Sequence, residues 1–145
     1  MIYLDSSCLV KLYIREHGSE AVESWLSGQS GQVVCCLHGR LEMIAAFKRQ
    51  QRAARLDEKA VRSAVKRLEK EEKAGVIRWL PINPLLIESA CTGMQKLAPA
   101  VFLRAADALH LACAADAGLK KIYSHDRRLL AAAPHFGLKG IDIIP

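Results

Sequence analysis

Five short apolar runs alternate with longer segments of helical periodicity, and this alternation limits the possible folds more than any other feature of the chain. The runs are apolar at successive positions rather than at every second position, which is typical of strands that are buried on both faces. Such strands, separated by helices, form a parallel sheet with helices on both sides. We expect strands at residues 2–4, 33–36, 76–80, 121–124 and 141–144.

The segments between these runs carry the signals of helix starts and ends. Asp57 and Asp126 stand where N-caps are expected, and Gly28, Gly75 and Gly118 stand where helices end. We expect helices at residues 8–13, 19–26, 41–55, 57–74, 84–99, 103–117 and 126–133. No repeat, low-complexity stretch or interior linker interrupts this order. The sequence therefore predicts an α/β fold of three layers, with a short, mostly parallel sheet between helices, in a single domain over residues 1–145.

Length and composition exclude several other classes of protein. A chain of 145 residues, 51% hydrophobic and 25% charged, suits one globular domain without disulfide or structural-metal support. No apolar run approaches the roughly 20 residues of a membrane span. Residues 1–5 enter the first strand without the pattern of a signal peptide. We therefore expect a cytoplasmic protein that makes no contact with a membrane.

The cysteines argue against a disulfide framework and against a zinc site. There are five, an odd number, and they lie within apolar segments, so we expect reduced core residues. They are Cys8, Cys35, Cys36, Cys91 and Cys113. No CxxC pair is present, although such pairs are typical of structural zinc sites.

Two aspartates follow predicted strands directly. Asp5 comes after the first strand and Asp126 after the fourth, and a helix begins at each. One interpretation is an N-cap, in which the carboxylate accepts backbone N–H groups and contributes about 1 kcal/mol. The other is a ligand site, because such sites lie beyond the carboxyl ends of parallel strands. Two acids at one edge of the sheet favour the second interpretation without excluding the first.

Asp107 lies within a segment that is otherwise almost wholly apolar. Apart from Cys113, the only other ionisable side chains between Ala105 and Ala117 are those of His110 and Asp116. A helix that is apolar nearly all round is buried, and an isolated buried carboxylate is too costly. Asp107 must therefore be paired, protonated or bound to a cation. Arg104, one turn earlier, is the candidate for an ion pair.

Glu42 completes a set of four acids. It lies at the start of the helix that follows the second strand, where the helix dipole stabilises an acidic side chain. It could also pair with Arg40 or Arg49. Together with Asp5, Asp107 and Asp126 it would supply the oxygen ligands that Mg²⁺ prefers. A metal held in this way lowers the pKa of a bound water and stabilises a phosphodiester leaving group. The four acids therefore predict a site for metal-dependent phosphodiester hydrolysis.

The chain resembles the PIN-domain family, and within it the VapC-type toxins of bacterial and archaeal toxin–antitoxin pairs. The resemblance runs along the whole chain and keeps the order of the four acids. The matching motifs are Met1-Ile2-Tyr3-Leu4-Asp5-Ser6-Ser7, Leu41-Glu42-Met43-Ile44-Ala45-Ala46-Phe47-Lys48-Arg49, Arg104-Ala105-Ala106-Asp107-Ala108-Leu109-His110-Leu111-Ala112 and Tyr123-Ser124-His125-Asp126-Arg127-Arg128-Leu129.

This resemblance implies a PIN-like fold and an Mg²⁺- or Mn²⁺-dependent endoribonuclease that forms a homodimer and is neutralised by a small antitoxin. Asp5, Glu42, Asp107 and Asp126 are the expected catalytic and metal-binding residues. Ser6, Arg104 and Ser124 are candidates for contacts to these acids or to the substrate. His110 and His125 lie close to the acids in sequence, and for both we favour a hydrogen-bonded structural histidine.

The net charge of +6 is unevenly distributed. Residues 48–55 hold four basic residues and no acid, which are Lys48, Arg49, Arg52 and Arg55. On a continuous helix, Lys48, Arg52 and Arg55 share one face and would follow the phosphates of RNA. A solvated basic face is the alternative, since such faces are common.

Several rival functions lack their motif. A haloacid-dehalogenase-type phosphatase needs a second aspartate two positions after Asp5, where this chain has Ser7. Paired acids of a receiver domain and a glycine-rich nucleotide loop are absent as well. The remaining alternative is a PIN-like module that binds RNA or a partner protein and has little or no catalytic activity.

Overall fold

A computed structural model describes residues 1–145, with five strands, seven α-helices and two 3₁₀ helices. The strands are β1 (Ile2–Tyr3), β2 (Val33–Cys36), β3 (Ile77–Leu80), β4 (Lys121–Tyr123) and β5 (Lys139–Ile141). The helices are α1 (Ser6–Leu9), α2 (Ser19–Ser27), α3 (Leu37–Arg52), α4 (Glu58–Lys73), α5 (Pro84–Gln95), α6 (Ala105–Asp116) and α7 (Arg127–Ala132). The 3₁₀ helices are η1 (Val10–Leu12) and η2 (Ala133–Phe136).

The strands form two parallel groups that meet at the end of β1. β2 lies between β1 and β3, and β4 pairs with β5. Leu4 bridges to Tyr123 in the parallel sense, and the Asp5 N–H donates to the Tyr123 carbonyl at 3.0 Å. The spatial order is therefore β3-β2-β1-β4-β5, and the direction of strand order reverses between β1 and β4. Ligands of open parallel sheets bind at such a reversal, so the fold directs attention to the residues after β1 and β4.

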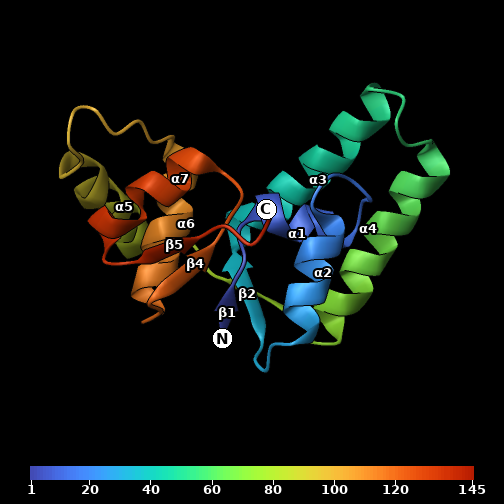
Figure 1. The fold of residues 1–145 in the computed structure, drawn as a ribbon, viewed down its shortest axis with the longest axis horizontal. Coiled ribbons are helices and arrows are strands. Elements are labelled where there is room, and N and C mark those ends of the chain that lie inside the picture. The colour runs from blue at the N-terminus through green and yellow to red at the C-terminus, as the bar shows by residue number, and fades with distance from the viewer.

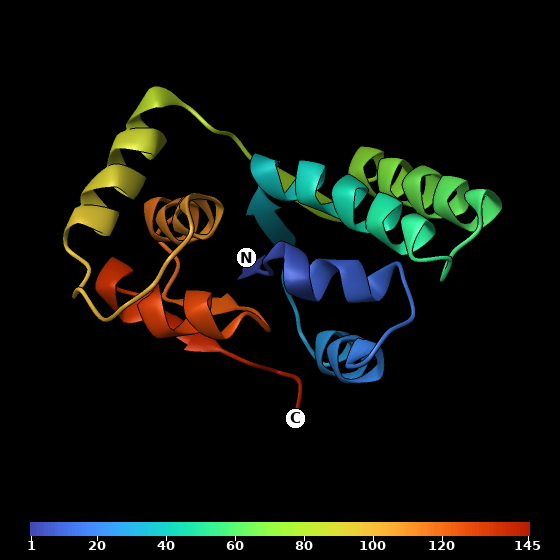
Figure 2. The ribbon, with the colours of Figure 1, turned by 90° about the horizontal axis from the view of Figure 1, so that it is seen from above.

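Figures 1 and 2 show β1–β3 between two groups of helices, with α1–α4 on one side and α5–α7 on the other. This arrangement confirms the predicted three-layer α/β fold. One cluster of 31 buried hydrophobic residues runs from Tyr3 to Leu138 and includes all four residues of β2. None of the helices combines the length and the apolarity that crossing a membrane requires.

The helix predicted at residues 41–55 has different bounds. α3 begins at Leu37, directly after β2, and ends at Arg52. Ala54 adopts a left-handed conformation with φ 54°, and the Arg55 N–H donates back to the Gln50 carbonyl, so the chain turns here. Arg55 therefore lies beyond the end of the helix. The prediction that it shares a helix face with Lys48 and Arg52 is wrong.

Three further predictions need correction. The last strand is residues 139–141 rather than 141–144, because the Asp142 side chain accepts the Ile144 N–H and ends the pairing with β4. α5 ends at Gln95 rather than at Pro99, because the N–H groups of Lys96 and Leu97 donate to the carbonyls three residues earlier and close the helix in a tight turn. Four cysteines are buried and unpaired, but Cys91 is exposed on α5.

Candidate functional site

The four predicted acids lie around one cleft of about 350 Å³. It lies at the reversal of strand order, where Figure 1 shows α3 on one side of α1 and α7 on the other. Its lining includes oxygen and guanidinium groups but no histidine or cysteine. The lining residues are Asp5, Ser6, Ser7, Val10, Glu42, Ala45, Ala46, Arg49, Arg104, Ala106, Asp107 and Asp126.

Asp5 is the most deeply buried of these acids, with 3% of its surface exposed. Oδ1 accepts the Cys8 N–H at 3.2 Å, so Asp5 is an N-cap of α1 as its position predicts. Burial raises the pKa of the Asp5 carboxyl, although the charge of His110 and the hydrogen bonds from Ser7 and Ser124 act in the opposite direction. The cap and a ligand role are compatible, because a carboxylate has four lone-pair sites on its two oxygens.

Two serines hold the Asp5 carboxylate in place. Ser7 Oγ donates to Oδ1 and Ser124 Oγ donates to Oδ2, each at 2.7 Å. Both hydroxyls also accept backbone N–H groups, Ser7 from His125 and Ser124 from Asp126, at 2.9 Å in each case. This network joins the end of β1 to the end of β4. Ser124 was among the predicted supporting residues; the role of Ser7 was missed, although its place two residues after Asp5 was a usable signal.

Asp126 has two different partners. Its Oδ1 caps α7 by accepting the N–H groups of Arg128 at 2.8 Å and Leu129 at 3.3 Å. Its Oδ2 accepts a hydrogen bond from Arg104 Nη2 at 2.6 Å. The N-cap interpretation is therefore correct for Asp126, and its second oxygen faces the side chain of Arg104.

Asp107 is 8% exposed and lies in the first turn of α6. Arg104 Nε donates to its Oδ2 at 3.0 Å, so the ion pair that the sequence left open is present. Arg104 thus bridges Asp107 and Asp126, and its own side chain is 55% exposed. Arg104 therefore occupies one oxygen of each carboxylate while its own side chain remains in contact with solvent.

Glu42 pairs with histidines rather than with the arginines that its sequence position suggested. His110 Nε2 lies 2.8 Å from Oε2, and His38 Nε2 lies 3.5 Å from Oε1. Arg40 instead forms an ion pair with Glu72 at 3.1 Å. Burial raises the pKa of Glu42, but the hydrogen bond and charge of His110 outweigh this effect and lower the pKa to about 2. Glu42 is therefore fully ionised at neutral pH.

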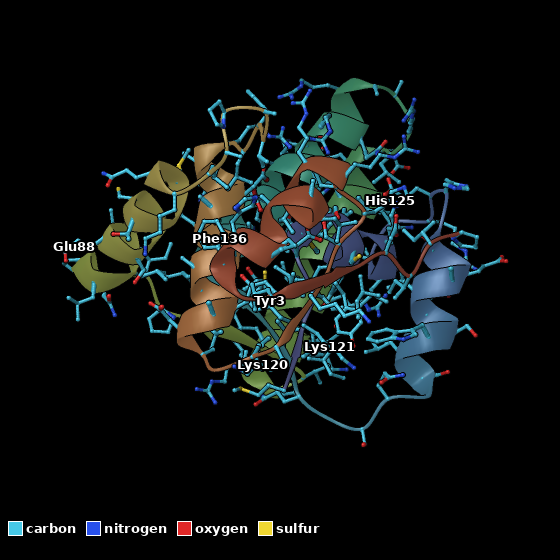
Figure 3. The ribbon with its side chains drawn as sticks, turned by 60° about the vertical axis from the view of Figure 1, so that its left-hand side comes forward. Tyr3, Glu88, Lys120, Lys121, His125 and Phe136 are labelled. Atoms are coloured by element: carbon cyan, nitrogen blue, oxygen red, sulfur yellow. The ribbon has the colours of Figure 1, made fainter.

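His110 connects Glu42 to the core. It is 1% exposed, and its Nδ1 lies 2.9 Å from the hydroxyl of Tyr3, which Figure 3 shows inside the molecule. Burial lowers the pKa of His110, but the Cys35 sulfur and the Glu42 carboxylate together raise it well above its ordinary value. His110 is a hydrogen-bonded structural histidine, as favoured from the sequence, and it also positions Glu42.

No three histidine, cysteine, aspartate or glutamate side chains stand close enough together to form a ready-made metal site. Arg104 lies between two of the acids, and Glu42 is turned toward His110. Even so, the donors that line the cleft are carboxylate and hydroxyl oxygens, which suit a hard divalent cation rather than zinc.

Of the predicted phosphate-binding residues, only Arg49 lines the cleft. It lies on α3 two turns after Glu42. Lys48 donates to Gln51 at 2.6 Å on the exposed surface, while Arg52 ends the helix and Arg55 follows it. Ser6 lines the cleft between Asp5 and Glu42, where its hydrogen bond helps to lower the pKa of Glu42.

Comparison with known proteins gives a consistent result. Residues 2–134 match the PIN domain family. The chain is 30% identical over 142 residues to Ribonuclease VapC47 of Mycobacterium tuberculosis (strain CDC 1551 / Oshkosh), an alignment that covers 94% of this chain and 93% of that protein.

Two solved structures share the fold. The FitAcB structure from Neisseria gonorrhoeae has a TM-score of 0.76 at 17% identity and covers 99% of this chain and 98% of its own. The structure of VapC20 from Mycobacterium tuberculosis, described as a sarcin-ricin loop cleaving toxin, has a TM-score of 0.71 at 18% identity and covers 91% of this chain and 95% of its own. Because the family match spans most of its length and the 30% identical relative covers nearly all of it, the chain belongs to the PIN-domain family.

Proposed function

We propose that this protein is a metal-dependent endoribonuclease that hydrolyses RNA phosphodiester bonds and acts as the toxin of a type II toxin–antitoxin pair. The observation that carries the proposal is that four acids far apart in sequence line one cleft. The likeness to Ribonuclease VapC47 along nearly the full chain supports RNA as the substrate.

Mg²⁺ or Mn²⁺ fits the oxygen donors of the cleft, and Asp5, Glu42, Asp107 and Asp126 would hold it. When bound, such an ion polarises the phosphodiester and generates a hydroxide nucleophile near neutral pH. The side chains around the acids prepare the site for this purpose. Ser7 and Ser124 each donate a hydrogen bond to one oxygen of Asp5, and His110 forms a hydrogen bond with Glu42.

The arginines of the cleft have a different part. Arg104 neutralises Asp107 and Asp126 while the site is free, and a change of partner would direct its guanidinium to a substrate phosphate. Arg49 also lines the cleft and would bind a neighbouring phosphate. Together the two arginines would supply positive charge beside a strongly acidic centre.

The rest of the proposal concerns partners. A small cognate antitoxin would neutralise the toxin, and the protein would act as a homodimer in the cytoplasm. Sedimentation of the purified chain alone, and with the product of a neighbouring small reading frame, tests both associations. A chain that remains a monomer would refute the homodimer.

The alternative is a PIN-like module that binds RNA or a partner protein with little catalytic activity. The pairing of Arg104 with both Asp107 and Asp126, and the absence of three converging ligand groups, favour this alternative. It predicts RNA binding that is indifferent to divalent ions.

Cleavage assays separate the two functions. The wild type, Asp5→Asn and Asp107→Asn would be incubated with structured and unstructured RNA in Mg²⁺, Mn²⁺ or chelator. Asp116→Asn is the matched control, because Asp116 is an exposed acid on α6 outside the cleft. We expect cleavage by the wild type and the control with metal, and none by the two site variants. Wild-type activity in either site variant would refute the assignment.

A further inference from the structure

Phe102 is the one aromatic residue among the large hydrophobic side chains that the protein exposes, with 60% of its surface accessible. It lies in the segment between α5 and α6, and burying its ring would favour the fold. The next residue, Leu103, is buried, so the segment is anchored directly beside the ring. The protein therefore holds a phenyl ring at its surface on an anchored segment.

Phe102 does not itself line the cleft, but the chain reaches the cleft two residues later, at Arg104. Phe102 precedes Arg104 by two residues, and Arg104 bridges Asp107 and Asp126. The guanidinium carbon of Arg128 lies 4.6 Å from the centre of the Phe102 ring. Arg128 belongs to the first turn of α7, and its N–H donates to Asp126 Oδ1 at 2.8 Å. Arg128 therefore contacts a site acid through its backbone, and Phe102 lies two residues before the arginine that pairs with two site acids.

We propose that the Phe102–Arg128 pair is a base-stacking subsite for single-stranded RNA, holding the base of a nucleotide adjacent to the cleaved phosphodiester. The proposal rests on the RNA substrate of the proposed function and adds a residue that binds the base rather than the phosphate.

The chemistry of the pair fits a nucleobase. Proteins recognise unpaired RNA bases by stacking them on aromatic rings or on the planes of arginine guanidinium groups. Arg128 lies over the ring at cation–π distance, and 60% of the surface of Phe102 remains accessible to a base. The pair would accept any base, because each has a π-face and neither side chain reads a hydrogen-bonding edge.

A second basic residue of the cleft gives such a strand a path. Arg49 lies on α3 and lines the same cleft as Arg104. Figure 1 shows α3 and α7 on either side of α1, which carries the residues that follow Asp5. RNA that contacts Arg49 through a phosphate and stacks on Phe102 would cross the four acids between these two points.

The test measures binding separately from cleavage. Short single-stranded RNAs carrying 2-aminopurine at successive positions would be titrated with the wild type, Phe102→Ala, Phe102→Leu and Phe102→Trp in chelator. We expect one position at which stacking changes the fluorescence, loss of that change with Ala and Leu, and its retention with Trp. The affinity should fall about tenfold or more with Ala and Leu, as loss of one base–aromatic stack produces.

Leu85→Ala is the matched control, because Leu85 is a large hydrophobic residue that is 71% exposed on α5 and lines a different surface hollow, with Glu88 and Ser89. We expect it to bind as the wild type does. Equal affinity and fluorescence for Phe102→Ala and the wild type would overturn the subsite and assign the exposed ring to a protein partner. The same result for Phe102→Leu would also overturn it, because leucine keeps the apolar contact and removes only the aromatic face.

Cleavage in Mg²⁺ or Mn²⁺ then distinguishes this proposal from the proposed function. RNA binding that depends on Phe102, in a protein that cleaves no RNA, would refute the ribonuclease and support the subsite. Cleavage that is independent of Phe102, together with unchanged affinity, would refute the subsite and support the ribonuclease.

Discussion

His110 Nε2 lies 2.8 Å from Glu42 Oε2, so a buried imidazole on α6 holds the carboxylate that α3 contributes to the cleft. The two residues are 68 positions apart in the chain, and their contact joins two helices that cover opposite faces of the sheet. Stability and site geometry are therefore linked at this pair.

The first prediction concerns the pH dependence of this link. Burial raises the pKa of Glu42, but His110 outweighs it, and the pKa falls from 4.5 to about 2. A carboxyl with a lowered folded-state pKa stabilises the fold above its unfolded value and loses that contribution as the pH falls toward the folded value. The free energy of unfolding of the wild type should therefore exceed that of Glu42→Gln at pH 7, and the difference should shrink between pH 4.5 and pH 2. Denaturant titrations check this, and a constant difference would contradict it.

The second prediction tests whether Asp107 is a ligand. Asp107→Asn should abolish cleavage and most of the stabilisation by Mg²⁺, which for the wild type is about 2.7 kcal/mol at a hundredfold excess over Kd. In chelator its stability should change by no more than about 1 kcal/mol, because the Arg104 partner is solvent-accessible. Thermal melts with Mg²⁺ and with chelator measure both effects, with Asp116→Asn as control. Strong destabilisation in chelator with the full Mg²⁺ shift would make Asp107 structural.

The third prediction concerns Arg104, whose cation competes with a metal for Asp107 and Asp126. Arg104→Gln should bind Mg²⁺ several-fold more tightly, since each partly exposed ion pair is worth about 0.2–1 kcal/mol. It should bind RNA more weakly, because it lacks a charge at the cleft. Calorimetric titration measures the first effect and RNA titration the second, with Arg127→Gln as the neighbouring control. Weaker Mg²⁺ binding by Arg104→Gln would show that Arg104 supports the metal site.

The fourth prediction uses Asp5. Burial raises the pKa of its carboxyl, with His110 and the serine hydrogen bonds opposing the increase. A metal ligand must be ionised, so Mg²⁺ binding should be lost on acidification at a higher pH than an unperturbed aspartate, with a pKa of about 3.9, would produce. Removal of the Ser124 hydroxyl in Ser124→Ala should raise that midpoint further. Mg²⁺ titrations from pH 4 to pH 8 measure the midpoint; a lower midpoint in the variant would contradict the prediction.

The fifth prediction separates the basic residues of α3. Arg49 lines the cleft, whereas Arg55 lies beyond the end of the helix. Arg49→Gln should weaken binding of single-stranded RNA and reduce the magnitude of the slope of log affinity against log salt by about 0.7, the value for one phosphate contact. Arg55→Gln should leave the slope unchanged. Equal slopes for the two variants would contradict the phosphate contact of Arg49 and support the interpretation of the basic segment as a solvated surface.

Much of the fold could be predicted from local patterns. Runs such as Val33–Cys36 are buried along their whole length and form a central strand, as their lack of alternation indicated. Helix starts at Asp57 and Asp126 follow from their capping side chains. The end of α3 was missed because Ala54 takes a left-handed conformation that its residue type does not signal.

The sequence by itself determined which acids would lie together and which edge of the sheet would hold them. A carboxylate within an apolar helix must be compensated, and acids that follow parallel strands must meet at one edge, because both statements depend only on local geometry and burial cost. The tertiary structure alone decided the partners: His110 rather than Arg40 for Glu42, Ser7 and Ser124 for Asp5, and Arg104 between Asp107 and Asp126. Those contacts depend on the order of the strands and on how the helices pack across them, and no periodicity in a single chain encodes which distant side chains will lie within 3 Å of each other.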